Sequence, residues 1–64
     1  MKKSIIDKYI NKNVILTDTF NNMYFGILEH LENAPGNNFY QLKTDRTIYF
    51  LSSRSIKKIK IILR

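Results

Sequence analysis

The residues best suited to chemistry lie in the last third of the chain, where positive charge alternates with apolar side chains. The stretch Phe50–Ile61 reads FLSSRSIKKIKI, with lysines placed around isoleucines after a serine-rich break. Residues 43–64 hold seven lysines and arginines against Asp45 alone, so the whole formal charge of +6 lies there. A one-sided basic region predicts a phosphate-bearing partner, because lysine–phosphate contacts release counterions. The alternative is that these lysines only keep an exposed edge strand from aggregating.

Catalysis is not predicted. His30 is the single histidine, there is no cysteine, and the five acidic residues are scattered. These residues do not form a nucleophile–base pair, a glycine-rich phosphate loop, a carboxylate pair or a metal site. We therefore expect a non-enzymatic protein without a cofactor or metal, and we interpret His30 as a surface or structural histidine.

The chain is short enough to form one domain, residues 1–64. Domains of about 60 residues bury only about 60% of their unfolded surface and usually need a further source of stability. Disulfides are excluded without cysteine, so self-association is the expected source. The start Met1–Lys3 imitates a signal peptide, but Asp7 and Lys8 interrupt the apolar run. No run is long and apolar enough for a transmembrane helix, so we expect a soluble, cytoplasmic protein.

A short helix is predicted at the start of the chain. Ser4 can cap it, with Asp7 three residues later able to return the hydrogen bond. Ile6, Tyr9 and Ile10 then fall on one face. Because about two helical turns have little stability alone, this helix must dock on the rest of the protein.

From residue 13 onward the pattern is that of β-strands separated by turns. Gly26 in mid-strand marks a bend or a close backbone approach. We expect Phe25, Tyr40 and Phe50 in the core. Phe20 is expected to be exposed. The predicted strands are Val14–Thr17, Met23–Leu31, Phe39–Thr44, Thr47–Leu51 and Ile56–Leu63.

This order predicts a mainly β fold, in which a short N-terminal helix precedes a five-stranded, strongly bent antiparallel barrel. The fourth strand is apolar at every position from Ile48 to Leu51, and Ile61–Leu63 ends the fifth. A barrel of this size can cover only one face of a strand from within. We therefore expect the fourth strand of one subunit to pair with the fifth strand of the next, which gives a homo-oligomeric ring.

The order of elements resembles that of the Sm-like superfamily, the LSm and Hfq-type small SH3-like barrels that assemble into rings. Phe50–Ile59 has the spacing of the family's second motif, in which two apolar residues precede Arg-Gly and two more follow, each after two variable residues. Val14–Leu16, Gly26–Leu28 and Leu31–Glu32 resemble elements of its first motif. Ser52–Ser53 stand where the family has Arg-Gly, and the Tyr-Lys-His element of Hfq is absent. The resemblance therefore implies the barrel and the ring, but not a standard uridine pocket.

The resemblance also implies that a ligand binds at the loops after the second and fourth strands, which converge near the pore of the ring. Asparagine and serine can hydrogen-bond base edges, and an aromatic or guanidinium plane can stack on a base. Lysines can follow a phosphate backbone. The alternative is that the asparagine and serine residues only form turns. The residues predicted to bind RNA are Asn33, Asn37, Asn38, Phe39, Ser52, Ser53, Arg54, Lys57, Lys58 and Lys60.

We expect a ring-forming Sm-like protein that binds single-stranded RNA. Two alternatives stay open: the same barrel binding or sequestering a small nucleotide, and an assembly module without a nucleic-acid ligand. RNA binding predicts affinity that rises with oligonucleotide length and falls steeply with salt. A nucleotide ligand predicts saturation by one small molecule, and an assembly module predicts neither behaviour.

Overall fold

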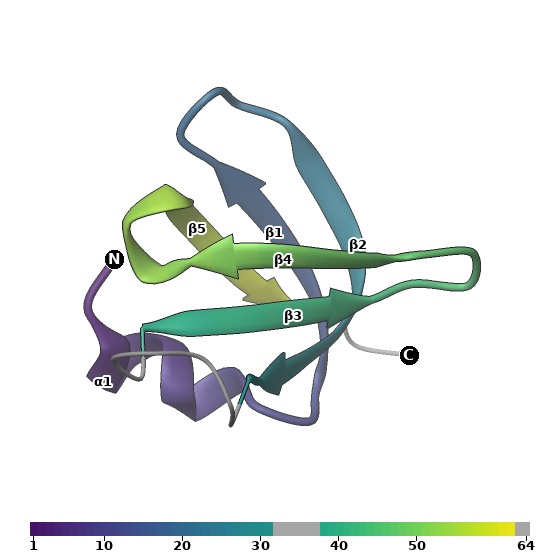
Figure 1. Cartoon of the computed structure of the whole chain (residues 1–64), viewed down its shortest axis with the longest axis horizontal. Helices are drawn as coiled ribbons and strands as arrows, with labels where there is room; N and C mark the ends of the chain where they lie inside the picture. The colour runs from purple at the N-terminus through teal and green to yellow at the C-terminus, as the bar shows by residue number, and fades with distance from the viewer. Residues whose placement is uncertain (32–37, 63–64) are drawn as a thin grey trace.

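The computed structural model of the chain describes residues 1–31 and 38–62. A short helical segment is followed by five antiparallel strands, as the sequence predicts (Figure 1). The helical segment consists of α1 (Lys3–Ile6) and a 3₁₀ turn, η1 (Asp7–Tyr9), and another 3₁₀ turn, η3 (Ser53–Ser55), precedes the last strand. The strands are β1 (Asn13–Asp18), β2 (Met23–His30), β3 (Phe39–Lys43), β4 (Ile48–Ser52) and β5 (Ile56–Ile61).

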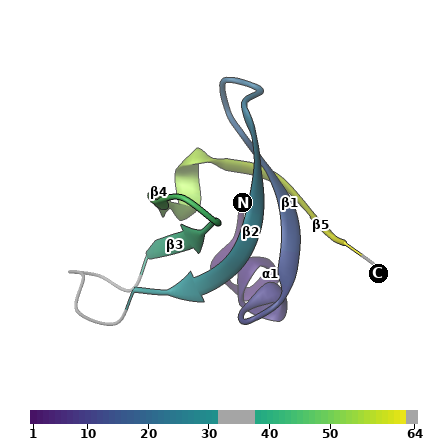
Figure 2. The same ribbon diagram turned by 90° about the vertical axis from the view of Figure 1, so that its right-hand side faces the viewer.

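The five strands form one antiparallel sheet in the order β4–β3–β2–β1–β5. The sheet curls, with the β3–β4 hairpin on one side and the β1–β5 pair on the other (Figures 1 and 2). It is not closed within the described residues, because β4 and β5 are its two edges. The mainly β prediction is therefore confirmed, and a single chain leaves the sheet open between β4 and β5.

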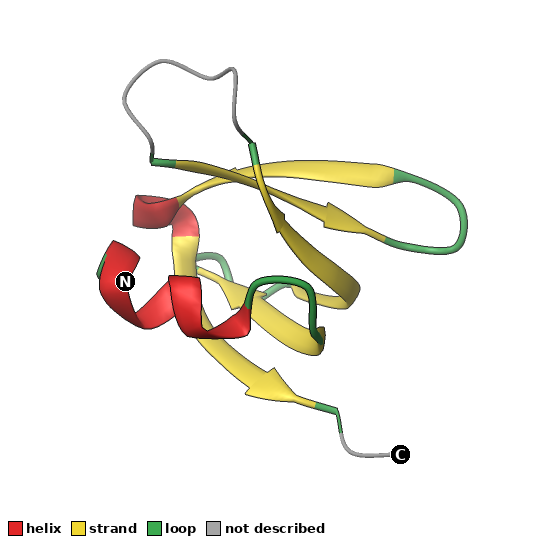
Figure 3. Cartoon of the chain, turned by 90° about the horizontal axis from the view of Figure 1, so that it is seen from below, coloured by secondary structure: helices red, strands yellow, loops and turns green. Residues whose placement is uncertain are grey.

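The inner side of the curled sheet holds the core. Successive residues of a strand alternate between its faces, and the inward positions are apolar. Figure 3 shows the helical segment lying beside the strands. Ile6 of α1 is fully buried here, and Tyr9 and Ile10 pack against the same cluster, which confirms the predicted helix face. Full burial of one large aliphatic side chain contributes about 1.5–3 kcal/mol. The buried apolar residues of the described chain are Ile6, Val14, Leu16, Leu28, Tyr40, Leu42, Ile56 and Ile59.

The predicted cap of the helix is wrong. Lys2, not Ser4, is the N-cap residue, and it makes no side-chain capping bond. The carboxylate of Asp7 accepts a hydrogen bond from Tyr40 Oη at 2.8 Å and another from Lys3 Nζ at 3.1 Å. A contact with a distant strand thus occupies the carboxylate that the local pattern assigns to capping.

Of the three aromatic residues predicted in the core, only Tyr40 is buried. Phe25 and Phe50 are 56% and 66% exposed, so their predicted burial is wrong. Leu28 faces inward on β2, and alternation therefore places Phe25 on the opposite face. Phe50 lies opposite Gln41 on that same outward face. Both strands carry apolar residues on two faces, and only one face packs against the core.

The β1–β2 turn is organised by Asp18, which is only 7% exposed. Its carboxylate accepts hydrogen bonds from the backbone N–H groups of Phe20 and Asn22 and from the Tyr24 hydroxyl, all at 2.9 Å. Asn21 adopts a φ of 67°, a left-handed conformation that asparagine tolerates. Phe20 is 83% exposed at this turn, as predicted.

Gly26 is a close backbone approach, as its position in mid-strand predicts. A Cβ atom at this position would overlap the carbonyl oxygen of Lys43 and would lie 2.9 Å from the carbonyl carbon. Gly26 pairs with Val14 of β1, whereas β3 joins β2 only from Ile27 onward. The glycine therefore lies where the β3–β4 hairpin diverges from β2.

Candidate nucleic-acid interface

The outer face of the sheet combines lysines with exposed apolar side chains. Residues that are directly opposite on neighbouring strands lie on the same face of a sheet. Two such rows cross β5, β1 and β2, and each runs from a lysine of β5 to an apolar residue of β2. We call this surface the β5–β1–β2 face, and its rows are Lys60–Ile15–Phe25 and Lys58–Thr17–Met23.

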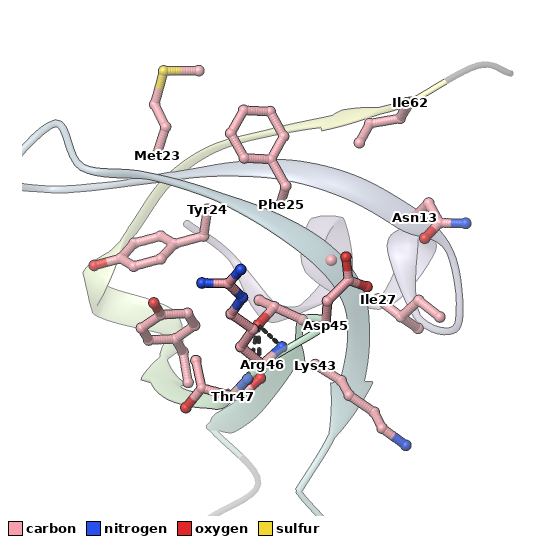
Figure 4. A pocket seen from close by; sticks show the side chains of 13 residues that line it. Asn13, Met23, Tyr24, Phe25, Ile27, Lys43, Asp45, Arg46, Thr47 and Ile62 are labelled. Atoms are coloured by element: carbon pink, nitrogen blue, oxygen red, sulfur yellow. Dashed lines mark hydrogen bonds between the residues drawn. The ribbon is translucent and has the colours of Figure 1, made fainter.

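The side chains of this face are accessible to a ligand. Met23 is 58% exposed, Phe25 is more than half exposed, and Lys58 and Lys60 are both exposed. Figure 4 shows Met23 and Phe25 projecting from the same side of β2, away from Tyr24. A hollow of about 150 Å³ on this face is lined by Ile15, Thr17, Met23, Lys58 and Lys60.

The two lysines of this face form no ion pair with any residue that the structure describes. Within residues 1–31 and 38–62 the single ion pair joins Lys3 and Asp7, with Nζ 3.1 Å from Oδ2. Ammonium groups without acidic partners can contact phosphates, and each contact releases counterions. An exposed aromatic ring beside them can stack on a base, which is worth about 1–3 kcal/mol. This combination suits a single-stranded nucleic acid.

Another group of predicted residues meets at the turn between β4 and β5. The N–H of Ser53 donates to the carbonyl oxygen of Asn38 at 2.8 Å, and Ser52 is paired with Phe39. Arg54 is exposed at the same turn. We call these five residues the turn cluster. The end of the β2–β3 connection and the β4–β5 turn are therefore in contact.

Several backbone carbonyl groups of this turn are hydrogen-bonded within the chain. The N-terminal amine of Met1 donates to the carbonyl oxygens of Ser53 at 3.0 Å and Ile56 at 3.1 Å. The Ser55 hydroxyl donates to the carbonyl oxygen of Ser52 at 2.8 Å. These bonds hold the backbone of the β4–β5 turn in place.

The remaining predicted residues are Asn33, Asn37 and Lys57. Asn33 and Asn37 lie outside the described residues. Lys57 donates from its Nζ to Oδ1 of Asn21 at 2.8 Å, which ties β5 to the β1–β2 turn. The predicted set thus divides between two surfaces, with Lys58 and Lys60 on one and the turn cluster on the other.

Sequence reasoning missed three apolar residues of the β5–β1–β2 face. Ile15, Met23 and Phe25 were recognisable as strand residues, and Met23 and Phe25 as members of one face. An apolar stripe normally marks a core, however, and only the pairing of β1 with β5 places this stripe beside Lys58 and Lys60.

A polar contact fixes the helical segment to the sheet. The hydrogen bond from Tyr40 lowers the pKa of Asp7, although desolvation opposes this, and Lys3 lowers it further. Burial raises the pKa of the Tyr40 hydroxyl, and its bond to Asp7 adds to this shift. The His30 ring lies edge-on to Tyr40, with centroids 5.5 Å apart, and its buried Nε2 has no hydrogen-bond partner among the described residues. These side chains hold η1 against β3.

Comparison of the chain with protein-family models, curated proteins and solved structures gives no match. Among the residues that the structure describes, no helix is long and apolar enough to cross a membrane. In the same residues, no group of three or more histidine, cysteine, aspartate or glutamate side chains is placed to hold a metal ion. The surfaces described above are therefore the basis for assigning a function.

Proposed function

We propose that the protein is an Sm-like, non-catalytic protein that forms a homo-oligomeric ring and binds single-stranded RNA. The observation that supports RNA binding most directly is the β5–β1–β2 face, where lysines stand beside exposed apolar residues in adjacent rows. Lys58 and Lys60 are two residues apart on one strand, so their Cα atoms are separated by about 7 Å. This spacing is similar to that between successive phosphates of an extended strand. In the proposal, the two lysines contact phosphates while a base stacks on Phe25.

The exposed ring of Phe25 favours a single strand over a duplex. Stacking needs a base whose face is accessible, and the faces of paired bases are covered by their neighbours in the duplex. The lysines alone would attract either form, because both carry phosphates.

The edge strands support the assembly part of the proposal. Ile48, Tyr49 and Phe50 of β4 are 43%, 40% and 66% exposed, and Ile61 of β5 is 43% exposed. Pairing β4 with β5 of a second copy satisfies the open backbone groups of both edges and covers Ile48, Phe50 and Ile61. The same head-to-tail contact, repeated, closes a ring. A ring repeats the β5–β1–β2 face, so weak contacts to one RNA strand add up to useful avidity.

Charge reversal on the face tests RNA binding. We expect Lys58→Glu with Lys60→Glu to lower the affinity for a fluorescently labelled, unstructured RNA by about 100-fold, measured by anisotropy over a series of salt concentrations. The slope of log K against log salt should fall by about 0.7 for each phosphate that the variant no longer neutralises. The matched control is Lys8→Glu with Lys12→Glu, which makes the same change in net charge on exposed residues away from the face.

The outcome of this pair of variants is decisive in both directions. If the control retains its affinity for RNA, the result supports RNA binding at the β5–β1–β2 face. If both double variants lose affinity equally, RNA binding depends on net charge alone and not on this face. Phe25→Ala should weaken binding by about 1–3 kcal/mol, while Phe20→Ala, at an exposed phenylalanine of the β1–β2 turn, should leave it unchanged. Absence of binding by the wild-type protein to RNA of any length at low salt would overturn the proposal.

A further inference from the structure

A groove of about 640 Å³ lies between β2 and the turn that joins β3 to β4 (Figure 4). This volume is within the range of about 300–1,000 Å³ that is usual for small-ligand sites. Met23 and Phe25 contribute to its rim as well as to the β5–β1–β2 face. The lining residues that belong to the groove alone and could recognise a ligand are Asn13, Tyr24, Lys43, Asp45, Arg46 and Tyr49.

Two tyrosines supply an aromatic platform in this groove. The ring centroids of Tyr24 and Tyr49 are 4.7 Å apart, with their planes tilted by 56°. The Tyr24 hydroxyl donates to Oδ2 of Asp18 at 2.9 Å, so its ring is held in place by the β1–β2 turn. A ring that is fixed before the ligand arrives loses little conformational entropy on binding.

A guanidinium group extends into the same groove. Arg46 lies on a turn closed by the hydrogen bond from Thr44 N to the carbonyl oxygen of Thr47 at 2.9 Å, and Thr44 Oγ1 also accepts from the N–H groups of Arg46 and Thr47 at 3.3 and 3.1 Å. Figure 4 shows the Arg46 side chain extending from this turn into the groove. Lys43 contributes to the lining at the end of β3, but its side chain extends away from Arg46 and Tyr24 in the same view. The guanidinium group of Arg46 suits a phosphate, because it can donate two parallel hydrogen bonds to the phosphate oxygens.

The combination of aromatic and cationic groups defines the class of ligand. Binding of a simple anion would not use the two tyrosine rings, and binding of an uncharged aromatic compound would not use Arg46. Asn13 and Asp45 add an amide and a carboxylate that can hydrogen-bond the hydroxyl groups of a sugar or the edge of a base. We infer that this groove binds a single nucleotide, with its base on the tyrosines and its phosphate on Arg46, at a site that shares only the rim residues Met23 and Phe25 with the proposed RNA surface.

Titration with nucleoside monophosphates tests this inference. The probes are AMP, GMP, CMP and UMP, the corresponding nucleosides and inorganic phosphate, followed by isothermal calorimetry and by backbone amide NMR shifts. We expect one nucleotide to bind per chain and to shift the amides of Tyr24, Gly26 and residues 44–47. Arg46→Gln should weaken nucleotide binding by about tenfold without affecting the nucleoside. Tyr49→Leu should weaken both by about tenfold.

The matched control is Arg54→Gln, which removes an exposed arginine from the turn cluster instead of the groove. It should leave nucleotide binding unchanged. The inference is overturned if no nucleotide binds saturably, if inorganic phosphate binds as tightly as the nucleotides, or if Arg54→Gln and Arg46→Gln lose affinity equally.

The same measurements separate this inference from the proposed function. The double variant Lys58→Glu with Lys60→Glu should retain nucleotide binding while it loses RNA, because neither lysine lines the groove. Loss of nucleotide binding in that variant would mean that there is one shared site and would overturn the inference of a separate one.

Discussion

The two edge strands of the sheet expose different kinds of side chain, although each is hydrogen-bonded to one neighbour within the described residues. On β5, Ile56 and Ile59 are buried and the lysines at positions 57, 58 and 60 are exposed. On β4, the exposed residues are Ile48, Tyr49 and Phe50, and the strand has no charge. Lysines on an edge discourage further strand pairing, whereas an apolar edge without charge invites it. The lysines therefore protect the β5 edge from unspecific strand pairing, whereas the β4 edge has no such protection.

This difference bears on how two copies can meet. A contact between two β5 edges places the lysines of both copies close together, and like charges on opposed strands are destabilising. In a contact between β4 and β5, the lysine stems can cover apolar surface while their ammonium groups stay in water. The contrast between the edges therefore favours the head-to-tail contact of the proposed ring over a symmetric β5 contact.

The largest expected effect follows from placing a lysine on β4, as β5 already has, because a charge on an edge strand discourages strand pairing. We expect Phe50→Lys to abolish assembly, because it places a charge in the apolar part of the unprotected edge. The native mass should fall to that of one chain, 7.6 kDa, at micromolar concentrations where the unmodified protein has a multiple of it. Native mass spectrometry or light scattering measures this directly.

Phe20→Lys is the matched control for this change. Phe20 is the more exposed of the two phenylalanines but lies in the β1–β2 turn, not on an edge strand. It should leave the native mass unchanged. An unmodified protein that is already a single chain at these concentrations would remove the ring from the proposed function.

The buried side of β5 gives the next largest effect. Ile59→Ala should lower the free energy of unfolding by about 2–5 kcal/mol, because Ile59 is 7% exposed in the core. Ile61→Ala, two residues away on the same strand and 43% exposed, should cost less than about 1 kcal/mol. Chemical denaturation in the Phe50→Lys background measures both without a contribution from assembly. Equal losses of unfolding free energy in the two variants would contradict the burial of Ile59 and the partial exposure of Ile61.

The smallest expected effect is the loss of stability in acid, which depends on Asp18 at the β1–β2 turn and Asp7 in η1. Burial raises the pKa of Asp18, but the hydrogen bonds from Asn22, Tyr24 and Phe20 outweigh it, so this pKa lies below its ordinary value of 3.8. Asp7, bonded to Tyr40, also has a lowered pKa. Because both folded-state values lie below the unfolded ones, this stabilisation is fully present at neutral pH. It is lost as the pH falls below about 4 through the lowered values.

Amide substitutions assign this acid dependence to the two carboxylates. Asp18→Asn or Asp7→Asn should lower the thermal midpoint at pH 7 and flatten its decline between pH 5 and about pH 2. Asp45→Asn, at the exposed β3–β4 turn, is the control and should keep the decline. A decline that is as steep in both variants as in the unmodified protein would show that neither carboxylate is responsible.

Most of the fold could be predicted because its signals are local. Strand ends fall within two residues of the predicted ones, since alternation and turn residues mark them along the chain. The exposure of Phe25 and Phe50 could not be predicted, because a strand with apolar residues on both faces does not reveal which face packs inward. The role of Asp7 was missed for a similar reason, since its partner Tyr40 is remote in sequence.

The candidate site was less predictable than the fold. Lys58 and Lys60 could be singled out from charge alone, but their neighbours Ile15 and Phe25 depend on pairing between β5, β1 and β2. The groove depends on Arg46 coming close to β2, which follows from the curl of the sheet. Cross-strand neighbours of this kind carry no signal in the spacing of residues along the chain.

The backbone of Lys43 fills the volume beside Gly26 that the Cβ atom of any other residue would need. Even one added methyl group would have to widen the angle between the β3–β4 hairpin and the β1–β2 pair. Arg46 and Phe50 move with that hairpin, so the proposed nucleotide binding and the proposed subunit contact both depend on the absence of a side chain at residue 26. Mutational drift at this position would therefore alter the two properties together, although residue 26 itself lies on neither the turn that carries Arg46 nor an edge strand.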